Sequence, residues 1–201
     1  EISVTHILPD NEPILLALSL PNFYAISNES TLGCDEFMVR LGHALQNGLR
    51  LIQVREKKLS SDTLLEFSKQ VVKLAHQYDA KVLINSDEKL AKKIGADGVN
   101  YSAAQLLNCT QRPPFHWCAA SCHNVEELRQ AENLGFDFAL LSPVLPTQSH
   151  PGEPHLGWEK FSELMRETKI PIYALGGLTV NDLNAAQQHG AHGISLLSQA
   201  W

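Results

Sequence analysis

The chain has 201 residues, of which 44% are hydrophobic and 19% are charged, and its formal net charge is −6. This length fits one domain with a full core, and the negative charge argues against a nucleic-acid partner. The sequence has no apolar run of membrane length, no signal-peptide pattern and no cysteine spacing typical of a metal site, so we expect a cytoplasmic chain with reduced thiols.

Residues 1–20 do not share the pattern of the rest of the chain, and we interpret them as a tail or linker before a domain at residues 21–201. In that domain, short apolar segments alternate with segments of helical periodicity. Helices are expected at 35–46, after the caps at Ser60–Asp62, at 88–94, after Asn124, at 158–167 and after Thr179. The expected strands are 22–27, 51–55, 81–84, 95–99, 117–120, 138–141, 170–175 and 193–197.

Eight strand–helix alternations predict an α/β fold, a single (β/α)8 TIM barrel with a short N-terminal tail. A doubly wound open sheet is the alternative. The long loop at residues 143–157 is rich in proline, and long loops in compact domains are often functional.

The strand at 51–55 carries an unusual polar face. Ile52 and Val54 point one way, whereas Gln53, Arg55 and Lys57 point the other way. Both faces of a parallel sheet covered by helices are buried, so such a row is costly unless an anion meets it. A phosphate or diphosphate is the expected ligand, because Arg and Lys both bind phosphate oxygens. A solvated strand end is the alternative.

Polar or glycine residues also follow the other predicted strands, at the rim where barrel active sites lie. Gly176-Gly177 and the strand that ends at Ser198 predict a backbone phosphate site, although Gly-Gly is also a common turn. His123 lies between a strand end and a helix cap, where an imidazole can serve as general acid or base; an ordinary loop histidine is the alternative. The remaining candidates on this rim are Asn85, Ser121 and Thr147.

The chain resembles the thiamine-phosphate synthase/TenI superfamily from about residue 22 to residue 198. The resemblance implies a phosphate-binding (β/α)8 barrel of thiamine biosynthesis. Synthases join hydroxymethylpyrimidine diphosphate to thiazole phosphate, whereas TenI members tautomerise a thiazole carboxylate phosphate with a histidine. The motifs that carry it are IQVREK (Ile52–Lys57), IN (Ile84-Asn85), GADGV (Gly95–Val99), SCH (Ser121–His123), SPVLPT (Ser142–Thr147), ALGGLT (Ala174–Thr179) and GISLLS (Gly193–Ser198).

The resemblance also implies roles for individual residues. His123 matches the TenI catalytic histidine, although synthases often carry a histidine there too. Ser121 and Gly176 belong to the substrate-binding set. The pyrimidine diphosphate would be held by Gln53, Arg55, Lys57 and Asn85, and the thiazole phosphate by Thr147, Gly177 and Ser198.

Three departures from the family pattern concern magnesium and diphosphate. Ser86 stands where synthases have a magnesium-binding aspartate, with Asp87 one place later, and the stretch from Asn100 to Gln105 has no carboxylate. The Thr-Lys pair of the sixth loop is replaced by Ser149-His150. Because Mg²⁺ prefers carboxylate oxygens, we name no metal-binding residue, leave Mg²⁺ open as a cofactor, and expect a magnesium dependence far weaker than in a true synthase.

The segment Ile7–Leu18 resembles the tail of MutT-type Nudix hydrolases, which implies that the chain is the C-terminal part of a fusion protein; no Nudix box is present. Three hypotheses follow. The first is a thiamine-metabolism enzyme, either TenI-like or a weakened synthase. The second is a non-catalytic phosphate-ligand module attached to a Nudix hydrolase of the 8-oxo-dGTP type, and the third is an unrelated phosphate-binding barrel. Pyrimidine diphosphate as a second ligand and homo-oligomer formation are left open.

Overall fold

The computed structural model describes residues 20–201. The expected tail or linker, and the Nudix-like segment within it, fall outside the described residues apart from Leu20. Leu20 is buried and packs with the residues at the floor of the barrel.

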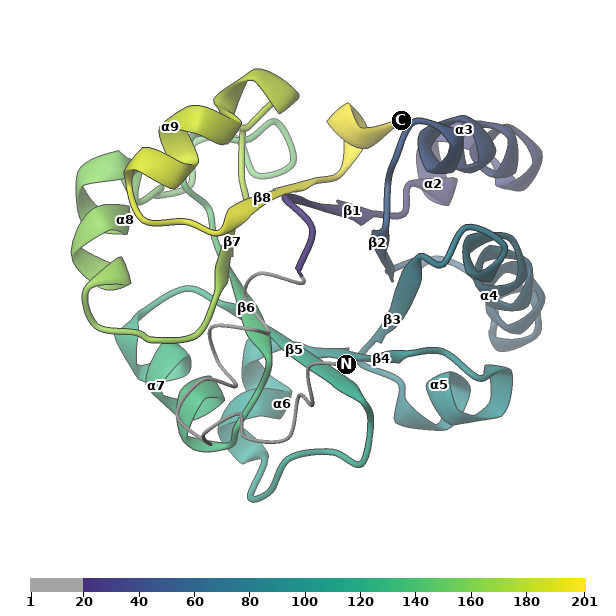
Figure 1. Cartoon of the computed structure of the whole chain (residues 1–201), viewed down its shortest axis with the longest axis horizontal. Coiled ribbons are helices and arrows are strands. Elements are labelled where there is room, and N and C mark those ends of the chain that lie inside the picture. The colour runs from purple at the N-terminus through teal and green to yellow at the C-terminus, as the bar shows by residue number, and fades with distance from the viewer. Residues whose placement is uncertain (1–19) are drawn as a thin grey trace, which may run out of the picture.

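Eight parallel strands close into one barrel in sequence order, which confirms the predicted (β/α)8 architecture and rules out the open sheet. The closing pair is β1 with β8, where Ala25 lies opposite Leu196. Figure 1 shows the strands as a ring with the helices outside it. The strands are β1 (Phe23–Ile26), β2 (Leu51–Val54), β3 (Lys81–Asn85), β4 (Gly98–Tyr101), β5 (Trp117–Cys122), β6 (Phe138–Leu141), β7 (Ile172–Ala174) and β8 (Gly193–Leu196).

Each predicted helix is present within one or two residues, apart from the segment after Thr179, which starts with a short 3₁₀ turn. In residues 20–201 no helix is both long and apolar enough to cross a membrane. The helices are α2 (Glu29–Leu32), α3 (Cys34–Gln46), α4 (Ser61–His76), α5 (Glu88–Ile94), α6 (Ala103–Asn108), α7 (Val125–Asn133), α8 (Gly157–Met165), η2 (Val180–Asp182), α9 (Leu183–Gln188) and η3 (Ser198–Ala200).

Two helices, α2 and α6, were absent from the sequence interpretation because both are too short to show a periodic apolar face. For α6 a local signal existed. Ser102 and Gln105 form a capping box, in which each side chain bonds the backbone N–H of the other residue.

The strands are buried on both faces, as expected for a parallel sheet inside a helical layer. In β2, Ile52 and Val54 point outward and pack with α3 and α4 residues such as Phe37 and Phe67. Leu51 points inward and joins the cluster that fills the barrel.

Three aromatic side chains fill the interior of the barrel. Tyr24, Phe138 and Tyr173 have ring centroids 5.3–5.5 Å apart and are fully buried. Burial raises the pKa of both tyrosine hydroxyls, so they stay neutral hydrogen-bond donors. The Tyr173 hydroxyl donates to the carbonyl oxygen of Pro21 at the N-terminal end of the barrel. This aromatic layer fills the middle of the barrel, beneath the cavity at its C-terminal rim.

All four cysteines are unpaired. Cys118 and Cys122 are buried in strand β5, and burial raises the pKa of Cys118 to about 11. Both therefore remain neutral thiols at physiological pH and act as small apolar core residues.

Candidate active site

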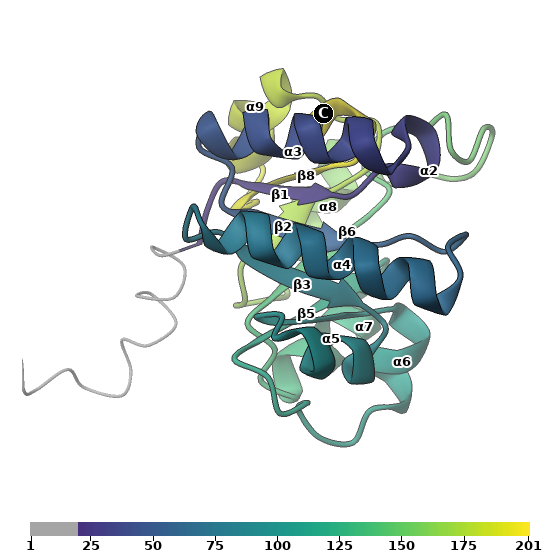
Figure 2. The same ribbon diagram turned by 90° about the vertical axis from the view of Figure 1, so that its right-hand side faces the viewer.

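A cavity of about 550 Å³ opens at the C-terminal ends of the strands. Figure 2 shows the barrel from the side, with the long green loop after β6 and helix α2 at this end. The cavity walls come from the ends of β2 and β5 and from the loops after β6, β7 and β8. Of the ten site residues predicted from the sequence, six line it: Arg55, His123, Thr147, Gly176, Gly177 and Ser198.

Gly176 and Gly177 form one wall, and their backbone conformation requires glycine. Their φ angles are +114° and +67°, and a Cβ on Gly177 would lie 2.5 Å from the carbonyl oxygen of Pro146. Within residues 20–201, the N–H groups of Gly176, Gly177 and Leu197 donate to no acceptor. Backbone N–H groups that lack an acceptor, in residues that line a cavity, can bind an anion.

Arg55 lies on another wall, at the end of β2. The turn that carries it is fixed by Ser27, whose hydroxyl oxygen accepts from the Arg55 N–H at 2.9 Å. The same hydroxyl donates to the buried carboxylate of Glu56, which also accepts from the N–H groups of Glu29 and Ser30 at 3.2 Å. The Arg55 guanidinium itself forms no ion pair in the described part of the chain.

Gln53 and Ser121 lie inside the barrel, and neither lines the cavity. The Gln53 side chain is 1% exposed and bonds the Tyr24 hydroxyl, but its Oε1 has no partner among the described residues. Tyr24 donates to Asn100 at 3.1 Å, and the Asn100 amide donates to Ser121 at 3.0 Å. A buried acceptor without a partner is costly, so Gln53 is an unusual feature of the barrel interior.

The structure leaves two predicted residues away from the cavity. Lys57 is exposed in the loop after β2, and Asn85 lies opposite Asn100 on the neighbouring strand. Conversely, His150 and Glu153 of the loop after β6 line the cavity, although neither is among the site residues predicted from the sequence. The sequence feature that could have identified them is their position in the long loop at residues 143–157.

His123 follows β5 and is half exposed to the cavity. Its Nδ1 lies 3.1 Å from Oε2 of Glu127, a residue that is not among the site residues predicted from the sequence. The spacing of four residues at the start of α7 was the signal that could have identified the pair.

The residues that the family resemblance places at magnesium-ligand positions bond other groups of the protein. The Gln105 amide donates to the Ser86 carbonyl oxygen at 2.9 Å and accepts from the Ser102 N–H at 3.1 Å. Asp87 accepts from the Leu90 N–H and so caps α5. No three metal-ligating acidic, histidine or cysteine residues converge within residues 20–201. This donor set does not fit Mg²⁺, which favours several carboxylate oxygens.

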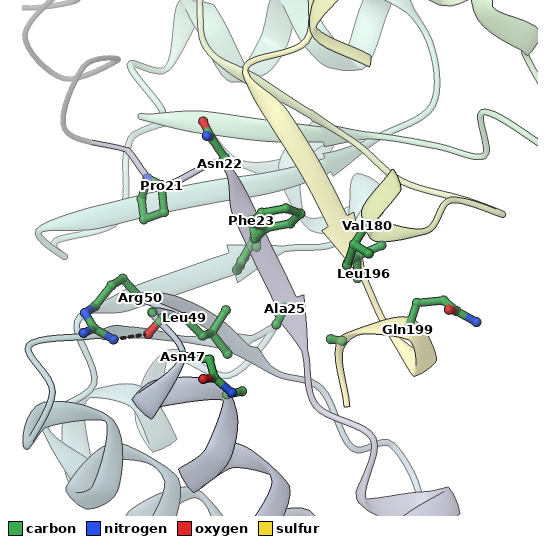
Figure 3. Close-up of a pocket in the computed structure, with 14 residues that line it drawn as sticks. Pro21, Asn22, Phe23, Ala25, Asn47, Leu49, Arg50, Val180, Leu196 and Gln199 are labelled. Atoms are coloured by element: carbon green, nitrogen blue, oxygen red, sulfur yellow. Dashed lines mark hydrogen bonds between the residues drawn. The ribbon is translucent and has the colours of Figure 1, made fainter. Parts of the chain in front are cut away.

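A second cavity, of about 610 Å³, lies on the outer side of the barrel, over β1 and β8 (Figure 3). Phe23, Val180 and Leu196 make it largely apolar. Its one charged side chain, Arg50, is occupied by the carbonyl oxygens of Leu45 and Leu49 at 2.9 and 2.7 Å. Apart from Arg50, whose Nη1 makes these two bonds, no lining side chain of this groove is charged, so the groove is less suited to catalysis than the cavity at the rim.

Comparison with known proteins agrees with the geometry. The family model described as thiamine monophosphate synthase matches residues 23–200. A putative thiamine-phosphate synthase 2 of Aquifex aeolicus is 34% identical over 90% of this chain and 98% of the relative. A thiamine-phosphate synthase of Desulfitobacterium hafniense is 28% identical over 88% and 87%.

Among solved structures, thiamine phosphate pyrophosphorylase from Pyrococcus furiosus has the same fold, with a TM-score of 0.73 at 24% identity over 88% of this chain and 85% of that one. The full-length family match, the curated relatives and the barrel agree with one another. The chain belongs to the thiamine monophosphate synthase family.

Proposed function

We propose that this barrel binds thiazole phosphate at the β6–β8 side of its rim and transfers a proton on the bound thiazole with His123, as TenI members do. The observation that carries the proposal is one cavity lined by free backbone donors, a guanidinium and an imidazole. The donors at Gly176, Gly177 and Leu197, together with Arg55, suit a phosphate. His123 suits a tautomerisation, in which one proton is removed and another returned with no net change in composition.

The second side of the rim supports a reaction without metal. Diphosphate release in a synthase depends on magnesium, and here Gln105 and Ser86 bond each other at the positions where the family holds the ion. A tautomerisation has no leaving group to neutralise, so it tolerates this loss. Thiamine phosphate synthesis by this chain is the weaker alternative for that reason.

Only some of the residues proposed to hold the pyrimidine diphosphate are placed to do so. Gln53 keeps an acceptor without a partner beneath the cavity. Lys57, in the loop after β2, and Asn85, the last residue of β3, do not line the cavity, and this weakens their proposed contacts with a pyrimidine diphosphate. We therefore propose that pyrimidine diphosphate binds more weakly than thiazole phosphate.

Two assays on the purified chain test the proposal. In the first, thiazole carboxylate phosphate is followed by NMR in buffer with EDTA, and we expect interconversion of its tautomers. In the second, thiazole phosphate and hydroxymethylpyrimidine diphosphate are mixed with Mg²⁺, and we expect little thiamine phosphate. Robust magnesium-dependent synthesis would refute the proposal. Phosphate-ligand binding with neither activity would instead support the non-catalytic module, including its use beside a Nudix hydrolase.

A further inference from the structure

The carboxylate of Glu127 contacts His123 in two places. Its Oε2 accepts from the backbone N–H of His123 at 2.5 Å and lies 3.1 Å from the ring Nδ1. These two contacts hold both the backbone and the ring of His123 against the first turn of α7.

Helix capping alone does not explain this arrangement. Asn124 is the N-cap and accepts from the Glu127 N–H at 2.9 Å. In an ordinary capping box, the acid at this position reaches back to the N-cap N–H. Glu127 instead bonds the residue before the cap, which is His123. Glu126, the other acid of the same turn, is exposed and makes no such contact.

Because Glu127 is buried, its carboxylate needs hydrogen-bond donors from the protein, and His123 supplies them. Its side chain is only 10% exposed, and within residues 20–201 it forms an ion pair with His123 alone. A buried carboxylate is costly without hydrogen-bond donors, so it favours a proton on Nδ1. An ionised carboxylate only accepts hydrogen bonds, so a bonded Nδ1 must carry that proton.

We infer that Glu127 is a positioning residue that fixes His123 in its Nδ1–H form and leaves Nε2 as the nitrogen that exchanges a proton with a ligand in the cavity. A nucleophile or base oriented by a third group is a recurring arrangement in catalysis. Arg55 and the glycine wall bind the phosphate from other strands, so Glu127 acts on proton transfer and not on phosphate affinity. The kinetic part of this inference rests on the proposed function, whereas the tautomer part does not.

The tautomer is measured first, by long-range ¹H–¹⁵N NMR of the free protein at a pH where His123 is neutral. We expect the Nδ1–H form in the wild type and a shift toward the Nε2–H form in Glu127→Gln. Glu126→Gln, the matched control in the same turn, should leave the spectrum of His123 unchanged. Identical His123 tautomers in the wild type and Glu127→Gln would overturn the inference.

The tautomerase rate and thermal unfolding are then compared in the same variants. We expect kcat of Glu127→Gln to fall about 10- to 100-fold, the range for outer partners of functional histidines. KM and the Kd for thiazole phosphate should stay near the wild-type values, because the phosphate donors lie on β7 and β8. A fall in thermal stability with an equal rise in KM would assign Glu127 a purely structural role and overturn the inference. If the tautomer shifts but the wild type has no activity, the proposed function fails and the positioning role of Glu127 stands.

Discussion

The two sides of the rim differ in how their hydrogen-bonding capacity is used. Around β7 and β8, the N–H groups of Gly176, Gly177 and Leu197 have no acceptor within residues 20–201, and all three residues line the cavity. Around β3 and β4, the Gln105 amide donates to the Ser86 carbonyl oxygen, and the Asp87 carboxylate accepts from the Leu90 N–H. The N–H groups around β7 and β8 are therefore available to an external anion, and we call this part of the rim the open side. The groups around β3 and β4 already bond other groups of the protein, and we call this part the closed side. On our proposal, the open side is a phosphate site, and on the closed side an amide bridge from Gln105 to Ser86 stands where the family resemblance implies magnesium ligands.

The largest expected effect is on the tautomerase rate, when His123, the proposed proton-transfer residue, is replaced. His123→Ala should lower the tautomerase rate by about 10²–10⁴-fold, the usual contribution of a general acid or base. Thiazole phosphate should still bind, because its donors lie on other strands. His123→Gln retains a hydrogen-bonding group but cannot titrate, and it should be equally slow. His155→Ala, an exposed residue of the long loop that does not line the cavity, is the control. Equal rates in all four proteins would remove His123 from the mechanism.

The next effect tests the phosphate wall directly. Gly177→Ala places a Cβ 2.5 Å from a backbone oxygen in a left-handed conformation, so the turn must move. Loss of hydrogen bonds to a charged group costs about 1.5–3 kcal/mol, which corresponds to roughly 10- to 100-fold weaker binding of thiazole phosphate in calorimetry.

Gly135→Ala separates backbone strain from loss of the site. Gly135 has φ of +75° but no atoms within 4 Å of an added Cβ, and it lies after α7, away from the cavity. We expect this variant to be less stable but to bind normally. Equal affinities for the two glycine variants would show that the Gly177 wall does not hold the phosphate.

A smaller effect, on the melting temperature in Mg²⁺, is expected when two carboxylates are introduced on the closed side. Ser86→Asp combined with Gln105→Asp removes the amide bridge and supplies two carboxylates, one after β3 and one in the first turn of α6. Ser86 has φ of +61°, a conformation that aspartate tolerates. We expect Mg²⁺ to raise the melting temperature of this variant by a few degrees and to leave the wild type unchanged.

The matched control is Ser86→Asp with Ala104→Asp. Ala104 is exposed, whereas Gln105 is the residue whose side chain meets Ser86. The control should gain no magnesium response. If the wild type responds to Mg²⁺ as strongly as the double variant, the closed side is a metal site after all.

The smallest effect concerns the bridge itself. Gln105→Ala removes the bond to Ser86 and half of the capping box of α6, so we expect a loss of about 1 kcal/mol in the free energy of unfolding. Gln111→Ala, an exposed residue nearby, should change stability by much less. Urea denaturation of both variants gives the comparison, and equal stabilities would mean that the bridge contributes nothing.

The periodic parts of the chain were predictable from the sequence. Eight short apolar strands gave the closed barrel, and strand alternation correctly separated Ile52 and Val54 from Gln53 and Arg55. The order of the strands brought Arg55 and Gly177 to one cavity, because parallel strands end at the same rim.

Side-chain partnerships were not predictable in the same way. Glu127 reads as an ordinary helix-start acid until the ring of His123 is placed beside it. Gln105 reads as a neutral substitution until its amide is seen on Ser86. Asn85 and Lys57 satisfy the same strand-end rule as Arg55, yet Asn85 is still part of β3, Lys57 is exposed in the loop after β2, and neither lines the cavity.

The contrast between the open and closed sides is tested most directly by calorimetric titration of the wild-type chain with thiazole phosphate, once in EDTA and once in Mg²⁺. We predict binding with the same Kd in both buffers, because the donors are backbone N–H groups and Arg55. Absence of binding, or binding only when Mg²⁺ is present, would contradict a phosphate site that works without a metal.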